Sequence, residues 1–177
     1  MKVINKIAKA ELSQFFYSPI AWLVLIVFTA QSGITFVGNF EENLQTFESG
    51  MGVLPLTEKI FTTPMGGMLN EMIQYLYLYI PLLTMGLISK EKANGSIKLL
   101  FSSPISNGQI ITGKFISMLI LGLFLIGVLF IYGLFCYFTI SHFDMPYYLT
   151  ALLGIYLLIC AYSAIGLFMS TLTSHQV

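Results

Sequence analysis

The sequence predicts an all-α protein, a bundle of membrane-spanning helices, and three observations lead to this fold class. Of its 177 residues, 56% are hydrophobic and only 9% are charged, whereas a soluble globular domain carries about 25% charged residues. The mean hydropathy is +0.84. The apolar residues gather in four uncharged runs, each long enough for a helix that crosses the hydrocarbon core of a bilayer. Residues 1–177 are therefore expected to form a single transmembrane domain.

Residues 2–17 are expected to form an amphipathic helix that lies at the membrane interface. Glu11 falls in the middle of its apolar side, where an unpaired carboxylate is costly, so it is expected to meet a lysine, a backbone N–H or lipid headgroups. The alternative is a helix that ends before Glu11 and leaves it solvated. A secretory signal peptide is disfavoured, because the uncharged run extends over residues 12–40. At about 100° per residue, the apolar side of the helix holds Val3, Ile4, Ile7, Ala8, Leu12 and Phe15, and the opposite side holds Lys2, Lys6, Lys9 and Ser13.

The first span is expected over residues 20–37, after a break at Ser18-Pro19. Trp22, at its start, fits the aromatic belt of the membrane interface. Residues 39–67 are polar and hold four glutamates but one lysine. They are therefore expected to form an irregular loop on the outer side.

The second span is expected over residues 72–89, with Pro81 in its interior. Proline removes a helical hydrogen bond, so a kink is expected there. The kink either acts as a hinge for a gate or is a fixed bend that improves packing, and both explanations stay open. The third span is expected over residues 115–139, long enough to tilt, and the fourth over residues 148–171. The fourth carries small residues that allow close helix contacts: Gly154, Ala161, Ser163, Ala164 and Gly166.

The loop over residues 90–114 holds four of the eight lysines. Glycine and capping residues at positions 94–96, followed by Pro104, predict one very short helix. Such a helix is not stable alone in water. Its apolar residues Ile97, Leu100 and Phe101, at i, i+3 and i+4, therefore need a groove on another protein. The alternative is that this face lies on the bilayer.

The lysines also predict the orientation. An N-terminus on the inside places seven lysines in the cytoplasm and only Lys59 outside, as the excess of positive charge in cytoplasmic loops requires. The protein is thus expected in the cytoplasmic (inner) membrane with a cytoplasmic N-terminus. Lys114 is expected to snorkel to the interface at the inner end of the third span.

Catalytic and metal sites are not expected. His142 and His175 fall on opposite sides of the membrane, and Cys136 and Cys160 lack the spacing of a metal site. The absence of arginine and of clustered basic residues excludes a nucleic-acid partner. Residues 108–114 match the first seven positions of a P-loop, but Phe115 replaces the hydroxyl residue that binds magnesium and no strand precedes the motif.

The spans carry no ionisable residue at mid-membrane, which disfavours an ion-coupled carrier. Glu71 is the ionisable residue that comes nearest to mid-membrane, and it lies at the outer mouth of the second span. It either lines a substrate path or, as we expect, is interfacial and solvated. A transporter that is driven by an external energy source is the natural alternative to an ion-coupled carrier.

Several motifs resemble the ABC-2 type transporter permeases, and among these the gliding-motility-associated permease subunits. They are Glu11-Leu12 with residues 16–19, residues 81–85 leading to residues 90–100, Ser103-Pro104-Ile105-Ser106, Gly113-Lys114, and residues 164–176. The resemblance implies the membrane-spanning permease subunit of an ATP-driven ABC transporter, expected to be an exporter. It implies a second permease subunit, identical or different, and a separate ATPase subunit that binds ATP and Mg²⁺, with no cofactor on this chain. Membrane lipids surround the spans.

In such permeases the loop between the second and third spans carries a coupling helix that sits in a cleft of the ATPase. The resemblance implies this role for residues 95–104, with Glu91 at the acidic position before them. The family usually has six spans, so this four-span chain is expected to be truncated at its C-terminus. The alternative function is a non-transporting membrane scaffold or assembly factor, and a membrane enzyme is the least expected. The expected coupling residues are Glu91, Gly95, Ser96, Ile97, Leu99, Leu100, Phe101, Ser103 and Pro104.

Overall fold

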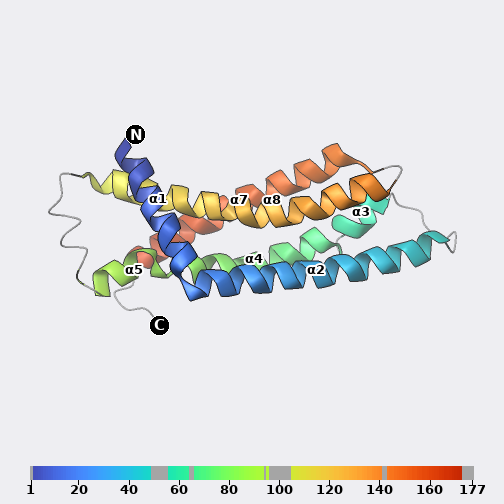
Figure 1. Ribbon diagram of the computed structural model, residues 1–177, viewed down its shortest axis with the longest axis horizontal. Helices are drawn as coiled ribbons and strands as arrows, with labels where there is room; N and C mark the ends of the chain where they lie inside the picture. Colours follow the sequence, from blue (N-terminus) through green and yellow to red (C-terminus); the bar gives the residue numbers. More distant parts are fainter. Residues whose placement is uncertain are drawn as a thin grey trace.

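The computed structural model is an elongated bundle of helices (Figure 1). It describes residues 2–48, 56–63, 66–93, 95, 105–140 and 143–172, and none of these residues forms a strand. Four helical segments are long and apolar enough to cross a membrane. Their outward side chains include large apolar residues such as Leu23, Ile26 and Phe138, which suits contact with lipid tails. The predicted fold class, a membrane-spanning helix bundle, is confirmed.

Helix α1, Lys2–Tyr17, crosses one end of the bundle obliquely (Figure 1) and packs mainly against α7, Asn107–Thr139. Ala8 and Glu11 are buried, whereas Lys6 and Lys9 are exposed. The predicted amphipathic helix is therefore confirmed, although Val3, expected on its apolar side, is 38% exposed.

Helix α2, Pro19–Glu48, and the short helix α3, Leu56–Phe61, are longer and more regular than expected. The expectation of an irregular loop over residues 39–67 is wrong for much of that range. The reason is aromatic packing: the Phe36 ring lies 4.8 Å from that of Tyr132 on α7 and 6.1 Å from that of Phe61 on α3, measured between centroids. These contacts anchor α2 at the end of the expected span, and its helix continues from there.

The expected second span is two helices, α4, Met68–Thr84, and α5, Gly86–Ala93. Pro81 lies inside α4, and the interruption comes one turn later, at Met85. The Thr84 hydroxyl donates to the carbonyls of Ile80 (3.0 Å) and Pro81 (3.1 Å). A threonine hydroxyl that bonds to these carbonyls competes with backbone amides and bends a helix. Proline and threonine together thus account for the break.

Helices α7 and α8, Met145–Leu172, form a long antiparallel pair (Figure 1). α7 begins eight residues before the expected third span, because Ser106 caps it and exchanges hydrogen bonds with Gln109. Residues 108–114 are therefore regular helix, which excludes a P-loop conformation.

Only part of the predicted small-residue set in α8 makes close contacts. Ser163 and Gly166 are buried, and a Cβ on Gly166 would lie 2.1 Å from the Thr84 hydroxyl oxygen of α4. The prediction is wrong for Gly154, Ala161 and Ala164, which are exposed. The reason is helical phase, since these three residues project from the other side of α8.

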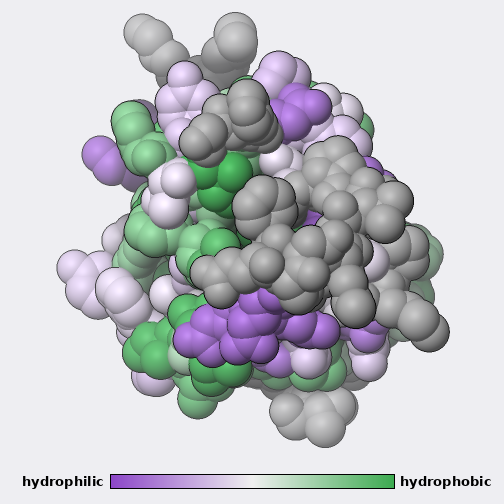
Figure 2. Space-filling model, turned by 90° about the vertical axis from the view of Figure 1, so that its right-hand side faces the viewer, coloured by the Kyte–Doolittle hydropathy of each residue, from purple (hydrophilic) through white to green (hydrophobic). Residues whose placement is uncertain are grey.

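The two ends of the bundle differ in charge. The end drawn on the right of Figure 1 carries Glu41, Glu42, Glu58 and Asp144 in α2, α3 and the residues before α8. Figure 2 looks onto this end and shows a hydrophilic patch flanked by hydrophobic side chains. The opposite end carries α1 with Lys6 and Lys9.

Candidate functional site

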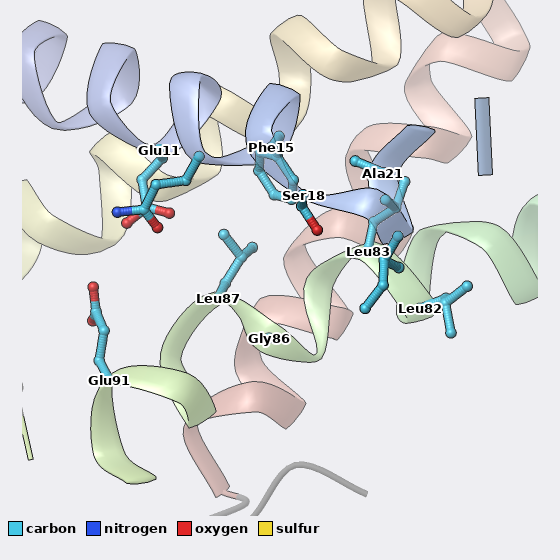
Figure 3. A pocket seen from close by; sticks show the side chains of 11 residues that line it. Glu11, Phe15, Ser18, Ala21, Leu82, Leu83, Gly86, Leu87 and Glu91 are labelled. Atoms are coloured by element: carbon cyan, nitrogen blue, oxygen red, sulfur yellow. The ribbon is translucent and has the colours of Figure 1, made fainter. Parts of the chain in front are cut away.

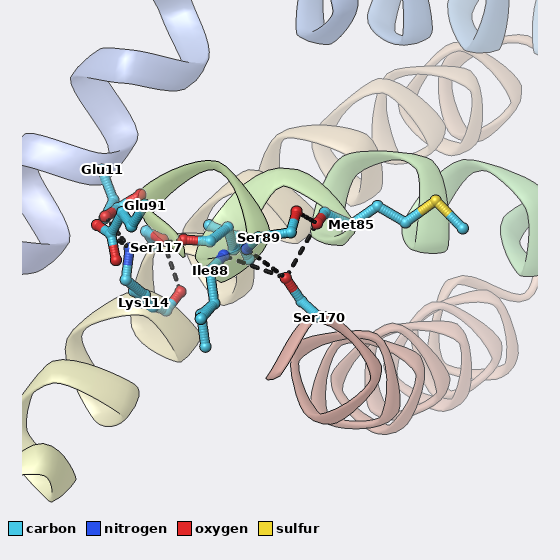
Figure 4. A network of polar contacts seen from close by, with 9 residues as sticks. Glu11, Met85, Ile88, Ser89, Glu91, Lys114, Ser117 and Ser170 are labelled. Carbon is cyan, nitrogen blue, oxygen red and sulfur yellow. Dashed lines mark hydrogen bonds and ion pairs between the residues drawn. The ribbon is translucent and has the colours of Figure 1, made fainter. Parts of the chain in front are cut away.

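A buried ion cluster joins three helices at the end of the bundle that carries α1. We call it the Lys114 cluster: Lys114 from α7, Glu11 from α1 and Glu91 from α5 (Figure 4). The Lys114 ammonium donates to the Glu11 carboxylate, to the Glu91 carboxylate at 2.8 Å and to the Leu87 carbonyl at 2.8 Å. A lysine ammonium has three donors, so all of them are engaged. The Lys114 side chain is 1% exposed.

The expectation that Lys114 snorkels to the interface is wrong. Helix α1 crosses the beginning of α7, and two carboxylates and a carbonyl take the place of water around the ammonium. A buried charge persists when it is paired and hydrogen-bonded in this way. The expectation that Glu11 would meet a lysine is confirmed, and the alternative of a solvated Glu11 is wrong, because its side chain is 11% exposed.

A glycine brings α1 close enough to α7 for this contact. A Cβ on Gly113 would lie 2.7 Å from Cγ2 and 2.8 Å from Cβ of Ile7. Real Cβ atoms do not approach so closely, so α1 occupies the space that a side chain at position 113 would fill. Gly113 thereby allows α1 to pack closely against α7, and the next residue, Lys114, reaches Glu11.

A second polar network ties α5 to α8. The Ser170 hydroxyl of α8 accepts hydrogen bonds from the backbone N–H groups of Ile88 (3.1 Å) and Ser89 (3.3 Å), and it donates to the Met85 carbonyl at 3.0 Å (Figure 4). The N–H groups of a first helical turn have no partner within their own helix. Ser170 supplies one from another helix and thereby ties the start of α5 to α8.

The two networks hold α5 and α7, the helices that flank the segment expected to couple the protein to an ATPase. That segment leaves α5, which ends at Ala93, and enters α7, which begins at Asn107. Gly95 has φ +69°, a left-handed conformation that favours glycine. The other expected coupling residues of the loop lie outside the described residues: Ser96, Ile97, Leu99, Leu100, Phe101, Ser103 and Pro104.

Of the two expected coupling residues that the structure describes, Glu91 belongs to the Lys114 cluster and Gly95 does not. In the sequence, Glu11, Glu91 and Lys114 lie far apart and were expected to have separate roles. A signal was present, because Glu11 interrupts an apolar helix face and therefore requires a cation. The sequence did not show which lysine would be the partner of Glu11.

The remaining predicted site residues lie outside the cluster. Trp22 is 50% exposed, and its indole N–H donates to the Phe16 carbonyl at 2.7 Å, which braces the turn between α1 and α2. Glu71 is partly buried and accepts a hydrogen bond from the Thr35 hydroxyl at 3.1 Å. Among the described residues, no group of three or more potential ligands could hold a metal ion.

Comparison with known proteins gives one family. A family model described as "ABC-2 family transporter protein" matches residues 5–177, a range that includes every residue of the Lys114 cluster. No curated protein and no solved structure gives a significant match.

Proposed function

We propose a function from the premise that this chain belongs to the ABC-2 transporter family, whose members are membrane permeases of ABC transporters. The chain is a multi-pass membrane protein and a transport subunit that is not itself catalytic. Beyond this, we propose that a separate ATPase, which binds ATP and Mg²⁺, drives it through residues 95–104. We further propose that it pairs with a second permease subunit and exports its substrate. Its motifs favour the gliding-motility-associated branch.

The observation that supports this coupling is the position of the Lys114 cluster. The Lys114 ammonium binds Glu91 of α5, the helix that leads into residues 95–104. Lys114 itself belongs to α7, the helix that follows those residues. The same ammonium holds α1 through Glu11. A force on the segment is therefore applied to three helices at once. Since α7 has 33 residues, at 1.5 Å per residue it carries a displacement over about 50 Å, to the other end of the bundle.

The break between α4 and α5 supplies the joint that such a movement needs. α5 is tied to α7 and α8 by side chains, whereas α4 ends at Thr84 and α5 begins at Gly86, so that Met85 belongs to neither helix. We propose that Pro81 and Met85 together form the hinge. The orientation we propose puts α1, the Lys114 cluster and residues 95–104 in the cytoplasm, where ATP is available, as the distribution of lysines favours.

Loss of the ATPase from the purified complex is expected when Leu100 and Phe101 are both replaced by aspartate. The two changes place carboxylates on the apolar face that we propose enters the ATPase cleft, and a charge buried there without a partner is strongly unfavourable. The measurement is recovery of ATP-binding-cassette ATPases with the tagged chain, quantified by mass spectrometry after purification from its own cells.

A matched control carries the same changes at Val53 and Leu54, in the segment between α2 and α3. We expect this variant to retain the ATPase. Equal recovery from the Leu100/Phe101 variant, at equal expression, would contradict the coupling and favour a membrane scaffold.

A further inference from the structure

A small pocket lies where α1 turns into α2, opposite the joint between α4 and α5 (Figure 3). We call it the elbow pocket and define it by Glu11 and Gln14 of α1, Ala21 of α2, Leu83 of α4, and Leu87 and Glu91 of α5. Its volume is about 80 Å³. This is room for several water molecules or a small polar group, not for a whole lipid.

The two ends of the elbow pocket differ in chemistry. Figure 3 shows the carboxylates of Glu11 and Glu91 turned toward each other at one end, and the side chains of Leu83 and Ala21 at the other. Lys114 approaches the two carboxylates from α7 and is 1% exposed, so it lies behind them. A ligand in the pocket therefore meets carboxylate oxygens, which accept hydrogen bonds, at one end and an aliphatic wall at the other.

The mouth of the pocket opens onto the surface that faces lipid. Ile20 and Leu82 belong to its lining and are 44% and 46% exposed. Both lie in spans, one residue after the start of α2 and two residues before the end of α4. The pocket thus opens near the depth of the membrane interface, where lipid headgroups meet their acyl chains.

We propose that the elbow pocket binds the primary ammonium headgroup of a membrane lipid such as phosphatidylethanolamine. The ammonium donates charge-assisted hydrogen bonds to Glu11 and Glu91, and the carbons beside it contact Ala21, Leu83 and Leu87. A choline headgroup has the same charge but no N–H donor and greater bulk, so it fits less well. The acyl chains stay outside, along Ile20 and Leu82.

The single tryptophan of the chain reports on this site. Trp22 follows Ala21 in α2, and bromine atoms on acyl chains quench tryptophan fluorescence at short range. The purified full chain is placed in liposomes that contain either brominated phosphatidylethanolamine or phosphatidylcholine with the same brominated chains. We expect half-maximal quenching at a mole fraction at least about threefold lower for phosphatidylethanolamine, as charge-assisted hydrogen bonds predict. Equal quenching by the two lipids would overturn the proposal.

Two variants connect the effect to the pocket. Gln14→Phe fills the acidic end from an exposed position of α1, and Ser13→Phe adds the same ring to α1 outside the pocket. We expect the preference for phosphatidylethanolamine to disappear in Gln14→Phe and to remain in Ser13→Phe. Glu11→Gln is expected to abolish it as well. A folded Gln14→Phe protein that keeps the preference would contradict the assignment.

Soluble ethanolamine separates a lipid from a free amine. Because the pocket opens toward lipid, the acyl chains hold the headgroup at high local concentration. Ethanolamine at millimolar concentration is therefore expected to leave the preference unchanged. Its removal by ethanolamine would show that a water-soluble amine occupies the site, which would overturn the lipid assignment.

Discussion

Replacement of Lys114 by methionine is expected to destabilise the protein more than any other single change considered, by about 3–5 kcal/mol. The reason is burial: Lys114 is 1% exposed and supplies the ammonium that Glu11 and Glu91 meet. Methionine preserves much of the volume and removes the charge. The measurement is the unfolding temperature in detergent micelles, followed with a thiol-reactive dye that reaches the fully buried Cys136 only on unfolding.

Two further variants identify the cause. Lys9→Met removes a charge from an exposed position of α1 and is expected to leave the unfolding temperature nearly unchanged. Lys114→Met combined with Glu11→Leu and Glu91→Leu is expected to regain most of the loss, because an apolar replacement of a whole buried ion cluster is often neutral or stabilising. A Lys114→Met protein as stable as Lys9→Met would show that the cluster does not hold α1, α5 and α7 together.

Substitution of Gly166 by alanine is expected to cost about 1–3 kcal/mol, in the range of overpacked cores. Its Cβ would lie 2.1 Å from Oγ1 and 2.9 Å from Cβ of Thr84. Thr84 is fully buried, and its hydroxyl bonds to the carbonyls of Ile80 and Pro81, so it cannot turn away without losing these bonds. Helices α4 and α8 must therefore separate next to the α4–α5 break.

Gly154→Ala is the matched control on the same helix. A Cβ there meets no atom within 4 Å, and alanine favours helix over glycine by about 1 kcal/mol. We expect the unfolding temperature to stay the same or rise. Equal destabilisation by the two substitutions would mean that the contact between α4 and α8 at Gly166 does not account for the effect.

The apolar spans and the amphipathic helix α1 could be predicted because length and apolar periodicity determine them directly. Glu11 is the clearest example, since its place on an apolar face required a partner before any partner was known. The environment of Lys114 could not be predicted in the same way. A lysine at the end of a span is expected to reach the headgroups, and only the path of α1 across α7 turns this residue into the centre of an ion cluster.

Two other differences have equally local causes. Glu41 and Glu42 indicated a loop, but charged residues are tolerated in a helix that extends into water. The packing of Phe36 against Tyr132 stabilises this part of α2. Pro81 indicated a kink, whereas the position of the break depends on the hydroxyls of Thr84 and Ser170. Neither hydroxyl is distinguishable in the sequence from the many other serine and threonine hydroxyls of the spans.

The most direct test of the proposed coupling is the side of the membrane on which residues 95–104 lie. Cys136 and Cys160 are replaced by alanine, a single cysteine is introduced at Ser103 or, in a separate protein, at Leu54, and cells are treated with a membrane-impermeant maleimide. We predict that Ser103→Cys is labelled only after the cells are permeabilised, whereas Leu54→Cys is labelled in intact cells. Labelling of Ser103→Cys in intact cells would contradict the account, because a segment outside the cell cannot contact a cytoplasmic ATPase.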